Sequence, residues 1–199
     1  LAQLVSLALA SDDLASARKA MQQLRVAGPG LLITGQQEAA LAYASGDHVR
    51  AREILQQMLR TAPDQVTLLL LAGQNELKLG SAVQAETMFA KALTLQPSSG
   101  TARRLLAQAQ LALGQVPKAL ATLQPLLDSA EVEAEVLTLA AEAQLQNGNA
   151  KAADALFARA ARMKPTDPQV RTRLATAALG RESDQFVYTE LNTIAAQDS

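Results

Sequence analysis

The chain has 199 residues, of which 49% are apolar and 3% aromatic, with no Cys or Trp and a formal net charge of -1. The lack of cysteine excludes disulfides, thiolate metal sites and thiol nucleophiles, and the near-zero charge gives a nucleic-acid partner no electrostatic support. Ala, Leu and Gln dominate, which favours helix, and no run of about 20 apolar residues suggests a membrane span.

Residues 1–13, LAQLVSLALASDD, contain the apolar run of a signal peptide but no basic segment before it. They also fit the repeat register described below, with Leu1 already four places into its unit. We therefore expect the first helix of a truncated repeat, and any targeting signal outside this sequence. This truncated repeat would expose Leu4, Val5 and Leu7, so we expect end-to-end self-association of two chains, which one added repeat should abolish if it is an artefact.

Five series of residues recur along the chain at a step of 34, which is the signature of a repeat architecture. They are one proline, one glycine, one alanine and two bulky or apolar series: Pro29, Pro63, Pro97 and Pro165; Gly46, Gly80, Gly114 and Gly148; Ala17, Ala51, Ala85, Ala119 and Ala153; Met21, Leu55, Phe89, Leu123 and Phe157; Leu24, Met58, Ala92, Leu126 and Ala160. Asp12 stands at the earlier glycine position, and Glu131 at the missing proline position.

Each series has a physical interpretation. Glycine tolerates left-handed φ and ends one helix. The alanine five residues later permits close packing of a second helix on the first, and the bulky residue lies one turn further on the same face. Proline then ends the pair, and Asp, Ser or Thr beside it (PDQ, PSS, PTD) is expected to cap the next helix.

Residues 66–99 carry the pattern most fully, at Leu69, Ala72, Gly73, Gly80, Ala85, Phe89, Ala92 and Pro97. Here the chain resembles the tetratricopeptide repeat (TPR) family, whose period is 34. The resemblance implies an all-α fold, a right-handed α-α superhelix of about six helix-turn-helix units. We expect one array over residues 1–199, divided into residues 1–31 (truncated), 32–65, 66–99, 100–133, 134–167 and 168–199.

Some positions depart from the family pattern. The first-helix signature position lacks its usual aromatic residue and holds Gly35, Leu69, Arg103, Leu137 and Arg171. Pro125 falls inside a predicted second helix, so we expect a kink or early end there, followed by a looser junction over residues 128–135. In the last unit Val187 replaces the packing alanine, so residues 168–199 are expected to be a degenerate repeat or a cap.

Little in the sequence points to chemistry. The single histidine, His48, is expected in an exposed turn, and neighbouring Asp47 does not supply the geometry of a Ser–His–Asp triad. One histidine without cysteine is poor material for a metal site. No GxxxxGK[ST] or GxGxxG motif is present, and we assign the GPG at residues 28–30 to an inter-repeat turn. The sequence predicts no catalytic residue, cofactor or metal, and a protein that is not an enzyme.

Charged residues alternate in blocks along the chain. Residues 128–150 carry acids and no base, which favours a solvated face, with a docking strip as the alternative. The basic clusters lack interleaved aromatic residues, so we interpret them as helix surfaces rather than a nucleic-acid site. These clusters are Arg103–Arg104, Arg159–Arg162–Lys164 and Arg171–Arg173.

The TPR resemblance implies that first helices line a concave groove that binds a protein or peptide segment. The side chains expected to face this groove are Gln36, Gln37, Tyr43, Leu70, Gln74, Lys78, Arg104, Gln108, Thr138, Glu142 and Arg173. Chaperone-adaptor TPR domains hold a peptide carboxylate with a Lys and an Asn one turn apart. No matching pair here is Lys/Asn: Ala2/Ser6, Gln36/Ala40, Leu70/Gln74, Arg104/Gln108 and Thr138/Glu142. We predict that the chain is not such a clamp, and that its amide-rich groove suits an extended segment or a helix.

Three segments of the chain look like the TPR lipoprotein of bacterial PEP-CTERM/exosortase systems. They are residues 139–180 (LAAEAQLQNGNAKAADALFARAARMKPTDPQVRTRLATAALG), residues 190–196 (ELNTIAA) and residues 105–127 (LLAQAQLALGQVPKALATLQPLL). This resemblance implies a larger array, lipid-anchored through a cysteine outside this sequence. It places the protein in the Gram-negative envelope, near exopolysaccharide production and protein sorting. Without it, a cytoplasmic location is expected.

Three functional hypotheses follow. We favour an interaction scaffold with a partner in the groove. The second hypothesis is a regulatory or substrate-recognition TPR segment of a larger enzyme or polysaccharide exporter, which the sequence beyond Ser199 would distinguish. The third is a self-assembling structural array.

Overall fold

The computed structural model describes residues 1–163 and residue 172, and every regular element in residues 1–163 is an α-helix. The predicted all-α helical-repeat fold is confirmed. The helices are α1 (Ala2–Ala10), α2 (Leu14–Ala27), α3 (Leu32–Ala44), α4 (His48–Thr61), α5 (Val66–Lys78), α6 (Ala82–Leu95), α7 (Gly100–Ala112), α8 (Val116–Leu127), α9 (Ala134–Gln146) and α10 (Ala150–Met163). The unit predicted over residues 168–199, with Val187, lies outside the described residues.

The sequence period recurs in the helix boundaries. Among the described helices, α3, α5, α7 and α9 begin 34 residues apart, and so do α2, α4, α6, α8 and α10. The turn inside each pair has a residue with positive φ, which is +74° at Gly80 and +77° at Gly46. Asp12 adopts φ 57° at the equivalent earlier place, although it is not glycine. The expected role of the glycine series, which is to end the first helix of each pair, is therefore confirmed.

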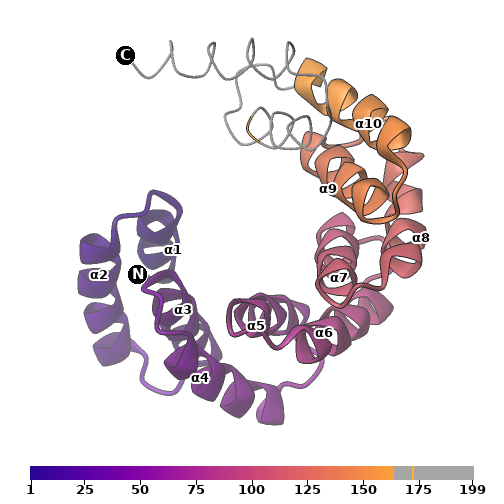
Figure 1. Ribbon diagram of the computed structural model, residues 1–199. Coiled ribbons are helices and arrows are strands. Elements are labelled where there is room, and N and C mark those ends of the chain that lie inside the picture. Colours follow the sequence, from indigo (N-terminus) through magenta and orange to yellow (C-terminus); the bar gives the residue numbers. More distant parts are fainter. Residues whose placement is uncertain (164–171, 173–199) are drawn as a thin grey trace, which may run out of the picture. The chain divides into compact units, whose positions relative to one another are not determined.

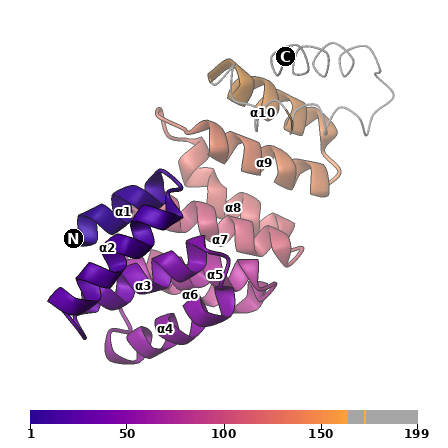
Figure 2. The same ribbon diagram turned by 90° about the vertical axis from the view of Figure 1, so that its left-hand side faces the viewer.

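The chain forms two compact units, residues 1–109 and residues 110–199. In the first unit, α1–α2, α3–α4 and α5–α6 are hairpins, and each second helix also contacts the first helix that follows it, α2 with α3 and α4 with α5. Helix α3 further contacts both α1 and α5. Figure 1 shows α1, α3 and α5 on one side of this row and α2, α4 and α6 on the other, and Figure 2 shows the first two hairpins from another side.

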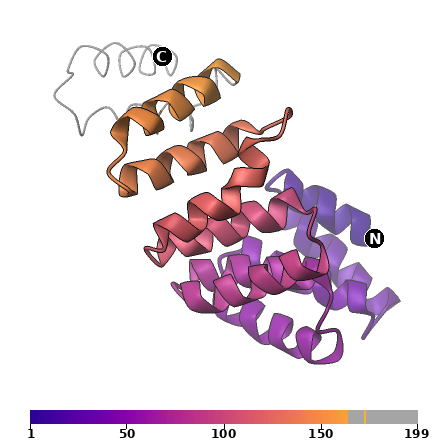
Figure 3. The same cartoon turned by 90° about the vertical axis from the view of Figure 1, so that its right-hand side faces the viewer.

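In the second unit, α9 packs against both α8 and α10, as Figure 3 shows. Helix α8 contains Pro125 and ends at Leu127 after 12 residues, whereas α2, α4, α6 and α10 each have 14. The expected early end is thus confirmed, and Leu126 in the last turn is only partly buried. Residues 128–133 form an irregular turn, but Val132 is buried and anchors it.

The core follows the alanine and bulky series. All five alanines are fully buried, as are the bulky residues one turn later: Ala17, Ala51, Ala85, Ala119 and Ala153; Met21, Leu55, Phe89, Leu123 and Phe157. The packing is tight, since a Cβ added at Gly73 would lie 2.4 Å from Cε1 of Phe89. Small residues on one helix therefore make room for large ones on its neighbour, as expected.

The capping expectation is confirmed in one place and wrong in another. The Ser99 hydroxyl accepts a hydrogen bond from the Ala102 N–H at 3.2 Å, at the start of α7. Asp64 does not cap α5; its Oδ1 lies 2.8 Å from Nζ of Lys91 instead. Two second helices use caps that the proline rule did not predict, because Asp13 and Asp47 accept from the backbone at the starts of α2 and α4. Helices α6 and α8 have no side-chain cap.

Candidate functional site

Most predicted groove residues lie on first helices of the first unit: Gln36, Gln37 and Tyr43 on α3, Leu70, Gln74 and Lys78 on α5, and Arg104 and Gln108 on α7. Lys78 and Gln108 are exposed, and the others except Gln37 are half-buried. Leu70 packs on the core cluster that contains Phe89 and Leu105, so it contributes to the fold as well as to the surface.

Two predicted residues, Gln37 and Thr138, are buried rather than presented at a surface. Gln37 is buried, and its Oε1 accepts a hydrogen bond from the Ser6 hydroxyl at 3.2 Å, which ties α3 to α1. Thr138 on α9 is buried too, and its hydroxyl donates to the Ala134 carbonyl at 2.8 Å. Arg173 lies outside the described residues. Glu142 is half-buried on α9 in the second unit.

The polar surface of α5 and α7 is what remains of the predicted groove. Leu70 and Leu77 of α5 pack on a cluster that includes residues of α7, so the two helices lie side by side. No hydrogen bond or ion pair joins their polar residues Gln74, Lys78, Arg104 and Gln108 to the part of the chain that the structure describes. Two amides and two cations are therefore available to a ligand on adjacent helices.

His48 is not an exposed turn residue, and that expectation was wrong. It begins α4, is half-buried, and lies edge-on to Tyr43 with ring centroids 5.4 Å apart. Its Nδ1 lies 3.1 Å from Oδ1 of Asn75, and the Asn75 amide donates to the His48 carbonyl at 2.9 Å. Because Oδ1 is an acceptor, Nδ1 carries the proton in this pair. Asn75 is fully buried, and these two bonds give both its amide oxygen and its amide nitrogen a partner.

A half-buried ion pair lies beside this contact. Nε of Arg52 donates to Oε1 of Glu76 at 2.8 Å, its Nη2 contacts Oε2, and Nη2 also donates to the Ser81 hydroxyl at 3.0 Å. The Glu76 side chain is 5% exposed. The hydrogen bond to Glu76 raises the pKa of Arg52 above its usual value. Sequence reasoning missed this pair.

The side chains of this junction are engaged with one another across α4 and α5. Within residues 1–163, no three His, Asp or Glu side chains converge on a common metal position. No helix in the same part of the chain is long and apolar enough to cross a bilayer. At the other end of the first unit, Leu4 and Leu7 are exposed as expected, but Val5 is fully buried, contrary to expectation.

Comparison with protein families agrees with the helical-repeat fold. Two family models described as Tetratricopeptide repeat match residues 37–100 and 76–143, which together span more than half of the chain. No curated protein sequence matches.

Solved structures share the fold at low identity. A thermophilic TPR protein in Thermus thermophilus is 21% identical, with a TM-score of 0.76 over 89% of this chain and 96% of its own. PilW, a widely conserved type IV pilus biogenesis factor, is 18% identical, with a TM-score of 0.83 over 98% of this chain and 90% of its own. MamA from Desulfovibrio magneticus is 18% identical, with a TM-score of 0.71 over 84% of this chain and 97% of its own. At these identities the likeness shows the fold alone.

Proposed function

Because the chain belongs to the tetratricopeptide repeat family, whose members generally serve as protein-interaction scaffolds, we propose that it is a non-catalytic scaffold. It holds a partner segment against the exposed face of its first helices. The observation that carries this proposal is the set of four polar side chains on α5 and α7 that have no partner within the described residues. Amide and cationic groups on adjacent helices suit the backbone carbonyls and carboxylates of a bound segment.

The proposed binding surface keeps the exposed and half-buried members of the predicted groove. It consists of Gln36, Tyr43, Leu70, Gln74, Lys78, Arg104 and Gln108, with Glu142 in the second unit and Arg173 beyond the described residues. Gln37 and Thr138 are buried and are left out of this surface. We further propose that the six predicted repeats form one array over residues 1–199, and that the exposed Leu4 and Leu7 allow end-to-end self-association.

The envelope setting is a finer proposal. Its support is the resemblance of residues 105–127, 139–180 and 190–196 to the TPR lipoprotein of PEP-CTERM systems, near exopolysaccharide production and protein sorting. The alternative is a regulatory or substrate-recognition segment of a larger enzyme or polysaccharide exporter.

Affinity capture from envelope and cytosolic extracts of the source organism tests the scaffold proposal. Lys78→Glu with Arg104→Glu reverses two charges on the proposed face. Arg18→Glu with Arg60→Glu reverses two exposed charges on second helices and serves as the matched control. Thermal melting should show that both variants fold. A partner retained by the control and lost by the first variant supports the proposal, whereas a partner retained by both variants refutes this face.

A further inference from the structure

The turn between α9 and α10 contains Asn147 followed by Gly148, which is the only Asn-Gly dipeptide in the chain. At the same register position in the preceding turns, the residue before the glycine is Ser45, Leu79 or Leu113. The α9–α10 turn thus differs from its equivalents by a side-chain amide directly before the glycine.

The backbone of these turns is the same whichever residue precedes the glycine. Asn147 has φ -80° and ψ 0°, and Ser45 has φ -79° and ψ 0°. The glycines that follow have φ of +76° at Gly148 and +77° at Gly46. The Asn147 side chain is exposed and has no hydrogen bond within the described residues. The fold therefore does not need an amide at this position.

An exposed Asn-Gly dipeptide has a defined reaction available to it. The main-chain nitrogen of Gly148 attacks Cγ of Asn147, and the new C–N bond closes a cyclic succinimide. The side-chain nitrogen leaves as ammonia and takes the proton that the Gly148 nitrogen loses. Water then opens the ring at either carbonyl and gives aspartate or isoaspartate. Glycine favours the attack, because it has no Cβ to shield the nitrogen and its φ is free.

The folded turn holds this reaction back. Because ψ of Asn147 is 0°, the Gly148 nitrogen eclipses the nitrogen of Asn147, whereas ring closure requires it to eclipse Cβ. The Gly148 N–H donates to the Leu145 carbonyl at 2.9 Å, and the Asn149 N–H donates to the Gln144 carbonyl at 2.8 Å. Both hydrogen bonds must open before the backbone can rotate. Exposed turns open locally at low free-energy cost, so the reaction is slowed rather than prevented.

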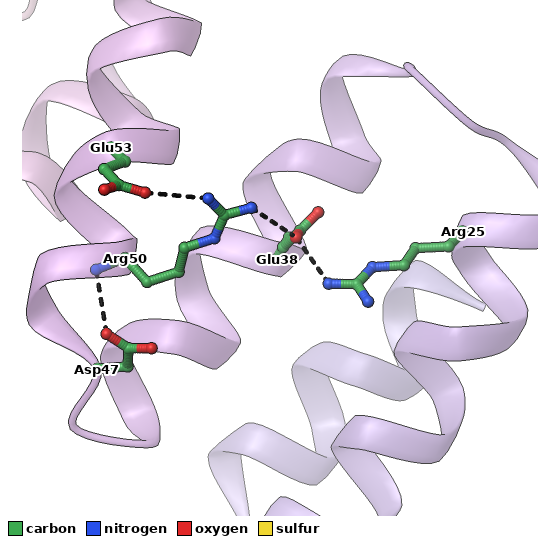
Figure 4. Close-up of polar contacts among 5 residues, drawn as sticks. All are labelled: Arg25, Glu38, Asp47, Arg50 and Glu53. Atoms are coloured by element: carbon green, nitrogen blue, oxygen red, sulfur yellow. Dashed lines mark hydrogen bonds and ion pairs between the residues drawn. The ribbon is translucent and has the colours of Figure 1, made fainter.

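The second asparagine of this turn lies in a different setting. Oδ1 of Asn149 accepts the Ala152 N–H at 3.3 Å at the start of α10. Asp47 makes the equivalent contact at the start of α4, where its Oδ1 accepts the Arg50 N–H at 3.1 Å (Figure 4). The residue after Asn149 is Ala150, whose Cβ obstructs the main-chain nitrogen. Asn149 is therefore an internal control, exposed in the same turn but unsuited to ring closure.

We propose that Asn147 is a site of spontaneous deamidation, and that opening of the α9–α10 turn controls its rate. The product carries a carboxylate at the C-terminal end of α9, where the helix carbonyls already concentrate negative charge. In the isoaspartate form, the former side chain becomes part of the backbone and lengthens it by one carbon. The hydrogen bonds of Gly148 and Asn149 then cannot both form with their present partners, so the turn loosens. This proposal does not depend on the scaffold function.

Peptide mapping by mass spectrometry tests the proposal after the folded chain has been incubated at neutral pH below its melting temperature. We expect aspartate and isoaspartate to accumulate at residue 147 and not at residue 149. A capped peptide of residues 144–150, Gln-Leu-Gln-Asn-Gly-Asn-Ala, is the unfolded reference. It should react roughly tenfold faster, since no turn has to open. Conversion at residue 147 no faster than at residue 149 would overturn the site, and equal rates in chain and peptide would overturn control by the turn.

Two variants and the isolated product test the consequence. Asn147→Ser copies Ser45, so it should keep the melting temperature of the natural chain and form no product at residue 147. Asn147→Asp reproduces one product without lengthening the backbone. Hydrogen exchange at the Gly148 and Asn149 amides should rise roughly tenfold in the purified isoaspartate form, and less in Asn147→Asp. Unchanged exchange in the isoaspartate form would contradict the loosening of the turn.

Discussion

The α2–α3 junction and the α4–α5 junction occupy the same repeat register but have opposite chemistry. Leu14 and Leu41 stand in the first junction where His48 and Asn75 form two hydrogen bonds in the second. Leu41 packs on the apolar cluster of α1 and α2. The 34-residue period therefore specifies where helices begin and turn, while the chemistry between successive repeats varies independently.

A second pair of positions repeats the contrast. Arg52 and buried Glu76 form the half-buried ion pair of the α4–α5 junction, whereas the equivalents in the α2–α3 junction are Arg18, which is exposed, and Ala42. Burial of paired charges adds little net stability, because desolvation offsets their attraction. Breaking the pair is costly, however, so the two junctions should respond differently to the same substitution.

The largest expected effect is at Arg52. Arg52→Leu leaves the carboxylate of Glu76 buried and unpaired, which should lower the free energy of unfolding by roughly 3 kcal/mol. Arg18→Leu should change it by less than about 0.5 kcal/mol, since Arg18 is exposed. Urea denaturation of both variants measures the contrast. Adding Glu76→Ala to Arg52→Leu should recover most of the loss, and the account fails if it does not.

Asn75 should give the next largest effect. Asn75→Leu removes both hydrogen bonds to His48 and should cost about 2 kcal/mol. Combining it with His48→Leu copies the Leu14/Leu41 pair and should restore part of that stability. Denaturation of the two single variants and the double variant gives the coupling free energy. A coupling near zero would show that the contact has no role in joining α4 to α5.

The turns before α2 and α4 provide a smaller test. Asp12 adopts φ 57° where Gly46 adopts φ +77°. Because an L-residue is strained in this region, Asp12→Gly should stabilise the chain by about 1 kcal/mol, and Gly46→Ala should destabilise it by a similar amount. Differential scanning calorimetry should show melting shifts of opposite sign. Shifts of the same sign would contradict the equivalence of the two turns.

The smallest expected effect is pH-dependent. Hydrogen bonding to Ser16 lowers the pKa of Asp13 below 3.8, its ordinary value. A carboxyl whose pKa is lower in the folded state contributes stability above the unfolded pKa and loses it as pH falls through the folded pKa. The difference in melting temperature between the natural chain and Asp13→Ala should therefore shrink below about pH 4. A difference that stays constant from neutral to acid pH would exclude the cap.

The sequence predicted the fold well because its strongest signals act locally. Glycine at Gly80 and alanine at Ala85 determine backbone and packing within one hairpin, so one period sufficed to place the helices. The contacts of His48, Asn75 and Glu76 were not predicted. Their partners lie more than 20 residues away, across a junction that the period does not specify. Thr138 is buried, and its hydroxyl bonds its own helix.

Site-specific photo-crosslinking tests the central claim, that the first-helix face holds the partner. A photoreactive residue replaces Lys78 on α5 in one protein and exposed Gln84 on α6 in another, and each is irradiated in extracts of the source organism. The account predicts a discrete crosslinked product from position 78, lost with Arg104→Glu, and none from position 84. Crosslinking of the same product from position 84, with none from position 78, would contradict it.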